Sequence, residues 1–187
     1  MNQTISRPSR VPRELNQGGT GTSELVFSVD GTLPVILPLP SAGQVAGAQG
    51  PARSQMGCIR ILAFGRVTGG TTTNYTPQLQ YGTSITPGSN TDIESGGAVA
   101  VNSVSGFWWI EAVLFIDNAS GKMSGCSRHM VHGSTTTFTD WAAIDNNITG
   151  VDPDGNGTLG FVVTGTFSAG NAANAAYLDG FLMELVA

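Results

Sequence analysis

The sequence predicts an all-β fold, a β-sandwich of the jelly-roll kind preceded by an extended arm. Short runs of alternating apolar and polar residues recur along the chain, and turns rich in Gly and Asn separate them. No segment shows helical periodicity over more than one turn. Strands following strands with Gly-rich turns are typical of a sandwich or barrel, and about eight to ten strands would form two sheets of about four.

The first 24 residues differ from the rest of the chain. They carry Arg7, Arg10 and Arg13, three of the eight basic residues, together with prolines that favour extended backbone. Residues 25–187 hold five Lys or Arg against eleven Asp or Glu, so this part carries −6 and the arm +1 of the net −5. Because the arm cannot bury enough apolar surface to fold alone, we expect an arm over 1–24 that orders against a partner, and one sandwich domain over 25–187.

The first half of the domain is expected to hold four strands. They cover 25–29, 33–39 with its edge-restricted prolines, 57–67 and 76–81, with loops over 40–56 and 82–97 and a turn at 69–74. The alternation is clearest in 57–67. There Ile59, Ile61 and Ala63 fall on one face, and Arg60, Leu62, Phe64 and Arg66 on the other.

The second half contains the strongest strand pattern. Strands are expected at 98–104, 107–117, 122–132, 159–167 and 177–186, with turns at 118–121 and 152–157 and a polar loop at 168–174. The Thr-rich stretch 134–139 follows the 122–132 strand, and the stretch 141–149 is ambiguous between strand and loop.

The composition indicates an assembly protein. Charged residues make up 11% of the chain, against about 25% in an ordinary soluble domain, and Gly contributes 26 residues. A surface of this kind suits packing against identical neighbours. The acidic net charge argues against nucleic-acid binding, and three arginines make a weak footprint for phosphate. We expect no signal peptide and no membrane span, because no apolar region follows the arginines and no window approaches 18 apolar residues.

Cysteine and histidine do not form a metal-binding pattern. Cys58 and Cys126 lie in apolar runs without a CxxC motif, and we interpret them as small buried residues and not as a disulfide. His129 and His132 are three apart in an expected strand, so they should point to opposite faces and be exposed.

The loop from Asp152 to Gly157 matches the start of a calcium loop, with oxygen-bearing residues at positions 1, 3 and 5 and Gly at position 6. Position 12, which usually supplies a bidentate Glu, is Val163. We interpret the segment as a turn between strands, and we predict no metal and no cofactor.

Catalysis is not indicated. No G-x-S-x-G motif occurs, and Asp140, Asp145 and Asp179 could pair with a His only through the fold. The carboxylates considered for glycoside hydrolysis are Glu94, Glu111, Asp117 and Glu184. Glu111 interrupts the strongest strand, and we interpret it as pointing outward together with Trp109 and Val113. The prediction is that the protein is not an enzyme.

The three tryptophans offer a binding surface. Trp108 and Trp109 are adjacent in a strand and must face opposite ways, so at most one of them belongs to the core. The other, or Trp141, could form a sugar-stacking platform. Aromatic residues are enriched at the centres of protein interfaces, which favours a subunit contact at Trp109.

The stretch 159–186 (LGFVVTGTFSAGNAANAAYLDGFLMELV) and the hairpin 107–125 (FWWIEAVLFIDNASGKMSG) resemble segments of jelly-roll virion structural proteins of tailed bacteriophages. The resemblance implies a capsid decoration or cement protein on the capsid surface, assembled in the host cytoplasm. Its expected partners are the major capsid protein and itself, as a homotrimer, with no nucleic acid and no membrane. Arg7, Arg10 and Arg13 are expected to pair with capsid carboxylates. The alternative is a tail-fibre or receptor-binding protein that binds carbohydrate.

Overall fold

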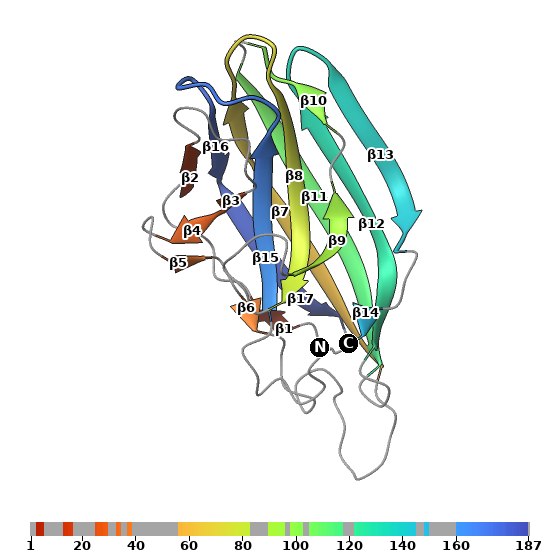
Figure 1. The fold of residues 1–187 in the computed structure, drawn as a ribbon. Helices are drawn as coiled ribbons and strands as arrows, with labels where there is room; N and C mark the ends of the chain where they lie inside the picture. The colour runs from red at the N-terminus through yellow and green to blue at the C-terminus, as the bar shows by residue number, and fades with distance from the viewer. Residues whose placement is uncertain are drawn as a thin grey trace.

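The computed structural model describes a two-layered all-β protein, which confirms the predicted β-sandwich (Figure 1). The jelly-roll form of the sandwich stays a prediction. The described residues are 3–5, 13–16, 25–29, 33–34, 37–38, 56–82, 90–95, 98–102, 105–117, 122–144, 148–149 and 160–186.

The larger sheet forms one layer. Its strands lie in the order β1 (Gln3–Ile5), β17 (Gly180–Val186), β7 (Met56–Thr68), β11 (Ser105–Asp117), β12 (Lys122–His132) and β13 (Thr136–Ala143). Three short strands join it from the side, namely β16 (Ala175–Leu178), which pairs with β7, β2 (Arg13–Asn16), which pairs with β16, and β14 (Ile148–Thr149), which pairs with β12. The pairs between described strands are antiparallel.

The smaller sheet forms the other layer. Its order is β10 (Val99–Ala100), β8 (Asn74–Gly82), β15 (Gly160–Phe167) and β3 (Leu25–Val26), with β9 (Thr91–Ser95) on β8 and β6 (Leu37–Pro38) on β15. A separate pair consists of β4 (Ser28–Val29) and β5 (Leu33–Pro34). From β7 onward the chain therefore changes layer four times, after β7, β10, β14 and β15.

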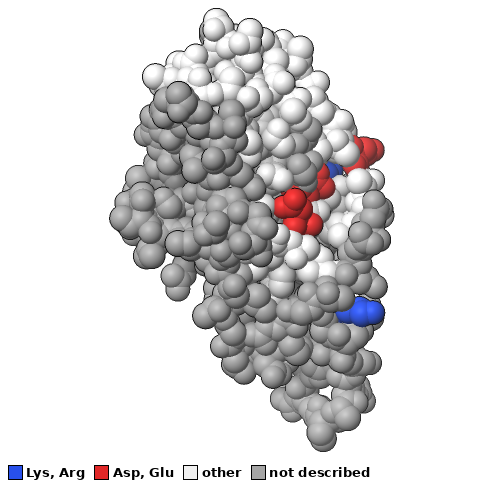
Figure 2. All heavy atoms as spheres, in the orientation of Figure 1, with Lys and Arg blue, Asp and Glu red and all other residues white. Residues whose placement is uncertain are grey.

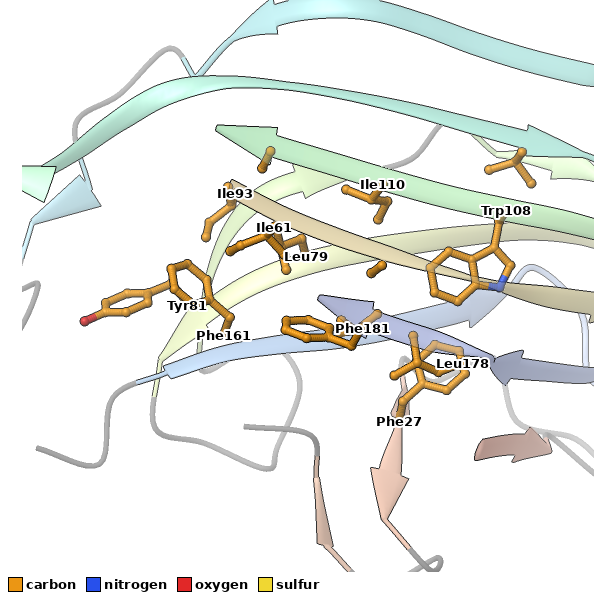
Figure 3. Close-up of a cluster of buried hydrophobic side chains, with 14 of the residues drawn as sticks. Phe27, Ile61, Leu79, Tyr81, Ile93, Trp108, Ile110, Phe161, Leu178 and Phe181 are labelled. Atoms are coloured by element: carbon orange, nitrogen blue, oxygen red, sulfur yellow. The ribbon is translucent and has the colours of Figure 1, made fainter. Parts of the chain in front are cut away.

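Strand alternation fills the space between the layers with apolar side chains. Ile59, Ile61 and Ala63 of β7 share one face, as predicted, and are fully buried, while their neighbours on the other face are not. Trp108 is among the largest buried side chains and stacks on Phe27, with ring centroids 5.5 Å apart. Figure 3 shows side chains of both layers converging around this centre. Burial of this apolar surface is the main stabilising contribution.

Two sequence expectations need correction, and one stretch that was left open is now assigned. The segment 82–97 was expected to be a loop, but it contains β9, whose single apolar residue Ile93 points into the core. The stretch 141–149, left open between strand and loop, begins as strand, because β13 runs to Ala143, and it ends in the short strand β14. The last expected strand, 177–186, is broken at Asp179, between β16 and β17. The break arises because Gly65 and Arg66 of β7 lie opposite three residues, 177–179.

Replacing Tyr75 with Phe is expected to raise the free energy of unfolding by about 1 kcal/mol, because a buried hydroxyl without a hydrogen bond costs stability. The Tyr75 hydroxyl is fully buried and has no hydrogen-bond partner among the described residues, and burial raises its pKa well above the usual value. Urea denaturation measures the change. A loss of stability would contradict the expectation, and Tyr177→Phe, at a half-buried tyrosine, is the control.

Candidate binding face on the larger sheet

The side of the larger sheet that points away from the smaller sheet, here called the outward face, carries large exposed aromatic side chains. They are Phe64, Phe107, Phe115, Phe138 and Trp141, each between 43% and 53% exposed. Single exposed apolar residues are ordinary, but a concentration on one face marks an interaction surface. Figure 2 shows the opposite side of the molecule, over the smaller sheet. Few of the described atoms on that side belong to charged residues, and the acidic atoms among them gather over β9.

Strand register aligns four apolar side chains in a row across the outward face, two of which belong to the exposed set above. Trp109 of β11 lies opposite Phe64 of β7 on one side and opposite Met130 of β12 on the other. Met130 in turn lies opposite Phe138 of β13. The Trp109 and Phe138 rings meet edge to face, with centroids 6.2 Å apart. We call these four residues the apolar row.

A charged group lies beside the apolar row. The Glu111 carboxylate is 6% exposed and is bound by two arginines from the neighbouring strands. Arg60 donates to Oε1 from Nε and Nη2, each at 2.6 Å. Arg128 donates to Oε2 from Nε at 2.8 Å and from Nη2 at 2.5 Å. Each carboxylate oxygen therefore accepts two charge-assisted hydrogen bonds from the side-on edge of one guanidinium.

The pKa of Glu111 reflects this environment. Burial raises it, but the hydrogen bonds and charges of Arg128 and Arg60 outweigh burial, so the net pKa lies below the usual value. A carboxylate that stays ionised and has both oxygens occupied is poorly suited to donate or accept a proton at neutral pH. Glu111 therefore serves to hold two guanidinium groups in place.

Arg128 is fixed from its flat sides as well. Its guanidinium carbon lies 4.5 Å from the ring centre of Trp141 and 5.3 Å from that of Trp109. A bulge in β13 makes this possible, since the register shifts between Ser127 and His129 and two residues, Asp140 and Trp141, lie opposite Arg128. Cation–π stacking adds about 0.5–1 kcal/mol at exposed sites and limits the rotamers of the arginine.

A concave hollow of about 530 Å³ lies over the same residues. Arg60, Glu111 and Arg128 line it together with Phe64, Phe107 and Trp109. The hollow combines aromatic walls with hydrogen-bond donors, while the two carboxylates that line it, Glu111 and Asp179, are already paired with arginines. This arrangement can bind a neighbouring surface or a ligand that offers acceptors, and it offers no nucleophile with a base.

The residues predicted to bind partners lie in separate parts of the chain, and only some of them are described by the structure. Trp109 lies on the outward face and Trp108 in the core, which confirms that the two face opposite ways. Arg13 begins β2, which pairs with β16 of the same chain, whereas Arg7 and Arg10 lie outside the described residues. The loop from Asp152 to Gly157 also lies outside them.

The expectation that His129 is exposed is wrong. Its side chain is 4% exposed, and Nδ1 lies 2.6 Å from Oε1 of Glu94, a residue of β9 in the opposite layer. Ser127 donates to the same carboxylate, and Thr139 lies 3.1 Å from Nε2. His132 lies on the other side of the strand, as predicted. The buried polar cluster links the two layers, and its burial gives a substrate no access.

Cys58 and Cys126 are unbridged, in agreement with the sequence interpretation. Both were expected to be buried, but each is only half-buried. Among the described residues, no group of three or more His, Cys, Asp or Glu side chains could hold a metal ion. Within the same residues, no helix has the length and apolar character to cross a membrane.

Comparison with known proteins adds little. No known family matches the chain, and no curated protein matches it. Among solved structures, the metal-free lectin I-B4 from Griffonia simplicifolia is similar over the full length of both chains, with a TM-score of 0.34 and 9% identity. A likeness this distant carries no argument about function.

Proposed function

We propose that this protein is a virion structural protein, of the kind that decorates or cements a phage capsid, and that it acts by binding alone. The observation that carries the proposal is the apolar row with its two fixed arginines on one face of the larger sheet, where Phe64 and Phe138 are exposed. Tryptophan, tyrosine and arginine dominate the binding energy of protein interfaces. The low charge of the chain and the resemblance of its hairpin and C-terminal stretch to phage virion proteins support the same role.

The partners in this proposal are the major capsid protein and further copies of the chain, as a homotrimer. Trp109 would contribute to the contact on the outward face. The arm would attach to the capsid through Arg7, Arg10 and Arg13, and loss of these arginines should weaken attachment while the sandwich stays folded. Within the chain itself, β1 pairs with β17 and β2 with β16, so these arm segments can add to a sheet as strands.

The test is mass spectrometry and cryo-electron microscopy of the particles that the gene's own virus produces. The proposal expects the chain in purified particles, with density outside the capsid shell where capsomers meet. Density confined to the tail would favour the rival role in host recognition, and absence of the chain from particles would overturn the proposal.

The rival role, carbohydrate binding, has one observation in its favour. Trp109 lines the hollow beside the end of Arg128, and an aromatic ring next to polar groups is a common arrangement for stacking a sugar. A glycan array would discriminate between the roles. Binding of a defined glycan by the native chain, lost on Trp109→Ala, would support the rival, whereas an array without signal leaves the assembly proposal as the better account.

A further inference from the structure

We infer that the β12–β13 end of the outward face is the contact between copies of this chain, in which Arg128 of one copy binds the Asp140 carboxylate of the next. This inference rests on the proposed role in assembly and specifies one of its surfaces. The contact consists of the guanidinium of Arg128, the carboxylate of Asp140 and the exposed rings of Phe138 and Trp141.

Arg128 is prepared to bind a second carboxylate. Its side-on edge, formed by Nε and Nη2, is occupied by Glu111, and two tryptophans cover its flat sides. No described residue is paired with its Nη1, so the end-on edge formed by Nη1 and Nη2 remains for a ligand, and the side chain is 32% exposed. An arginine held in this way loses little entropy when it binds, and the end-on edge fits a carboxylate with two hydrogen bonds.

Asp140 supplies the complementary group. At the bulge in β13, Asp140 and Trp141 lie opposite Arg128, and both side chains are exposed. Oδ1 of Asp140 accepts a hydrogen bond from the backbone N–H of Trp141 at 2.8 Å, which fixes the carboxylate, and no ion pair joins Asp140 to a described basic residue. Donor and acceptor therefore lie side by side on one patch, each fixed by its own chain.

A patch that holds both partners of an ion pair is complementary to a second copy of itself. In a closed oligomer each copy can give its carboxylate to one neighbour and its guanidinium to the same or another neighbour. An unrelated acidic partner would use Arg128 and leave Asp140 facing its own carboxylates. The charges on the patch therefore favour a second copy.

The strand itself favours association as well. β13 is the last strand of the larger sheet among the described residues, and its eight residues contain no Pro, Lys or Arg. Phe138 is 53% exposed and Trp141 43% exposed on this strand. Long edge strands with exposed apolar residues and few charges pair with other chains unless something covers them. Another copy of the chain covers this edge in our proposal.

The experiment is sedimentation velocity of the full chain across a concentration series, with Asp140→Asn as the main variant. Asn keeps the oxygen that accepts from the Trp141 N–H and removes only the charge. We expect self-association to weaken about tenfold, which corresponds to the loss of a charge-assisted pair. Arg128→Lys should weaken it similarly, since Lys lacks the planar fork, and circular dichroism would verify that each variant is folded.

The matched control is Glu184→Gln, which removes one negative charge from the outward face, where Glu184 lies 3.5 Å from Arg60. The inference expects this variant to associate like the native chain. Equal weakening by both charge removals, or no weakening by Asp140→Asn, would overturn it. A native chain that stays monomeric at about 100 µM would also overturn it, whereas the proposed function depends separately on the presence of the chain in particles.

Discussion

Replacing Glu111 with Gln is expected to lower the free energy of unfolding by about 3 kcal/mol, among the largest effects of any single change on the outward face. The carboxylate is 6% exposed and binds Arg60 and Arg128 through both oxygens. The amide oxygen of Gln can serve one guanidinium, and its NH₂ group then faces the other. Removing one member of a buried ionic group costs about 3–5 kcal/mol, and the lower end applies because the arginines are 44% and 32% exposed.

The same variant should change how stability depends on pH. The folded pKa of Glu111 lies below its usual value near 4.5, so the ionised carboxylate stabilises the native chain above that pH. As the pH falls from about 4.5 through the folded pKa, the carboxylate binds a proton and this stabilisation is lost. The native chain should therefore lose its advantage over Glu111→Gln in this acidic range, while the difference stays constant near neutral pH.

Urea denaturation at neutral pH and at a series of acidic values measures both effects. Glu184→Gln is the control, because Glu184 is 31% exposed and lies at 3.5 Å from Arg60, and its loss should cost less than about 1 kcal/mol. If Glu111→Gln were as stable as the native chain at pH 7, the ion pairs of Glu111 with Arg60 and Arg128 would contribute nothing to the free energy of unfolding. A large loss that stayed unchanged down to pH 2 would point to packing and not to charge.

Part of this ionic group could be read from the sequence. The turn predicted at 118–121 implies a hairpin, and in the structure β11 and β12 pair with Asp117 opposite Lys122 and Glu111 opposite Arg128. Alternation also predicted that Glu111 and Trp109 share one face. The second arginine could not be predicted, because Arg60 reaches Glu111 through the pairing of β7 with β11, strands that are far apart in the chain.

The errors at β9 and His129 have a common physical cause. The strand Thr91–Ser95 contains one apolar residue, so composition alone indicates a loop, and only its pairing with β8 makes it a strand. Alternation predicted that His129 and His132 face opposite ways but could not tell which side is buried. His129 has a partner on the buried side because Glu94 reaches it from the other layer. Contacts between layers are decided by packing and leave no local signal.

Replacing Gly65 with Ala is expected to lower the free energy of unfolding by about 3 kcal/mol or more, because the added methyl group would meet backbone atoms that cannot move alone. Ala176 pairs with Val67 and Gly180 pairs with Phe64, so three residues of the β16–β17 segment face Gly65 and Arg66. A Cβ on Gly65 would lie 1.7 Å from the carbonyl oxygen of Tyr177, and 3.0 Å from the Trp108 ring.

Relief of that clash requires the break between β16 and β17 to shift. The shift would disturb the hydrogen bond from the Asp179 N–H to the Phe64 carbonyl at 2.9 Å and the ion pair of Arg66 with Asp179. The matched control is Gly180→Ala, whose Cβ would meet only the end of the Phe64 ring, at 2.3 Å, and that ring is 43% exposed and can rotate. Thermal and urea unfolding should therefore rank Gly65→Ala well below Gly180→Ala in stability. Equal stability of the two variants would mean that the backbone crossing at Gly65 is looser than its geometry indicates.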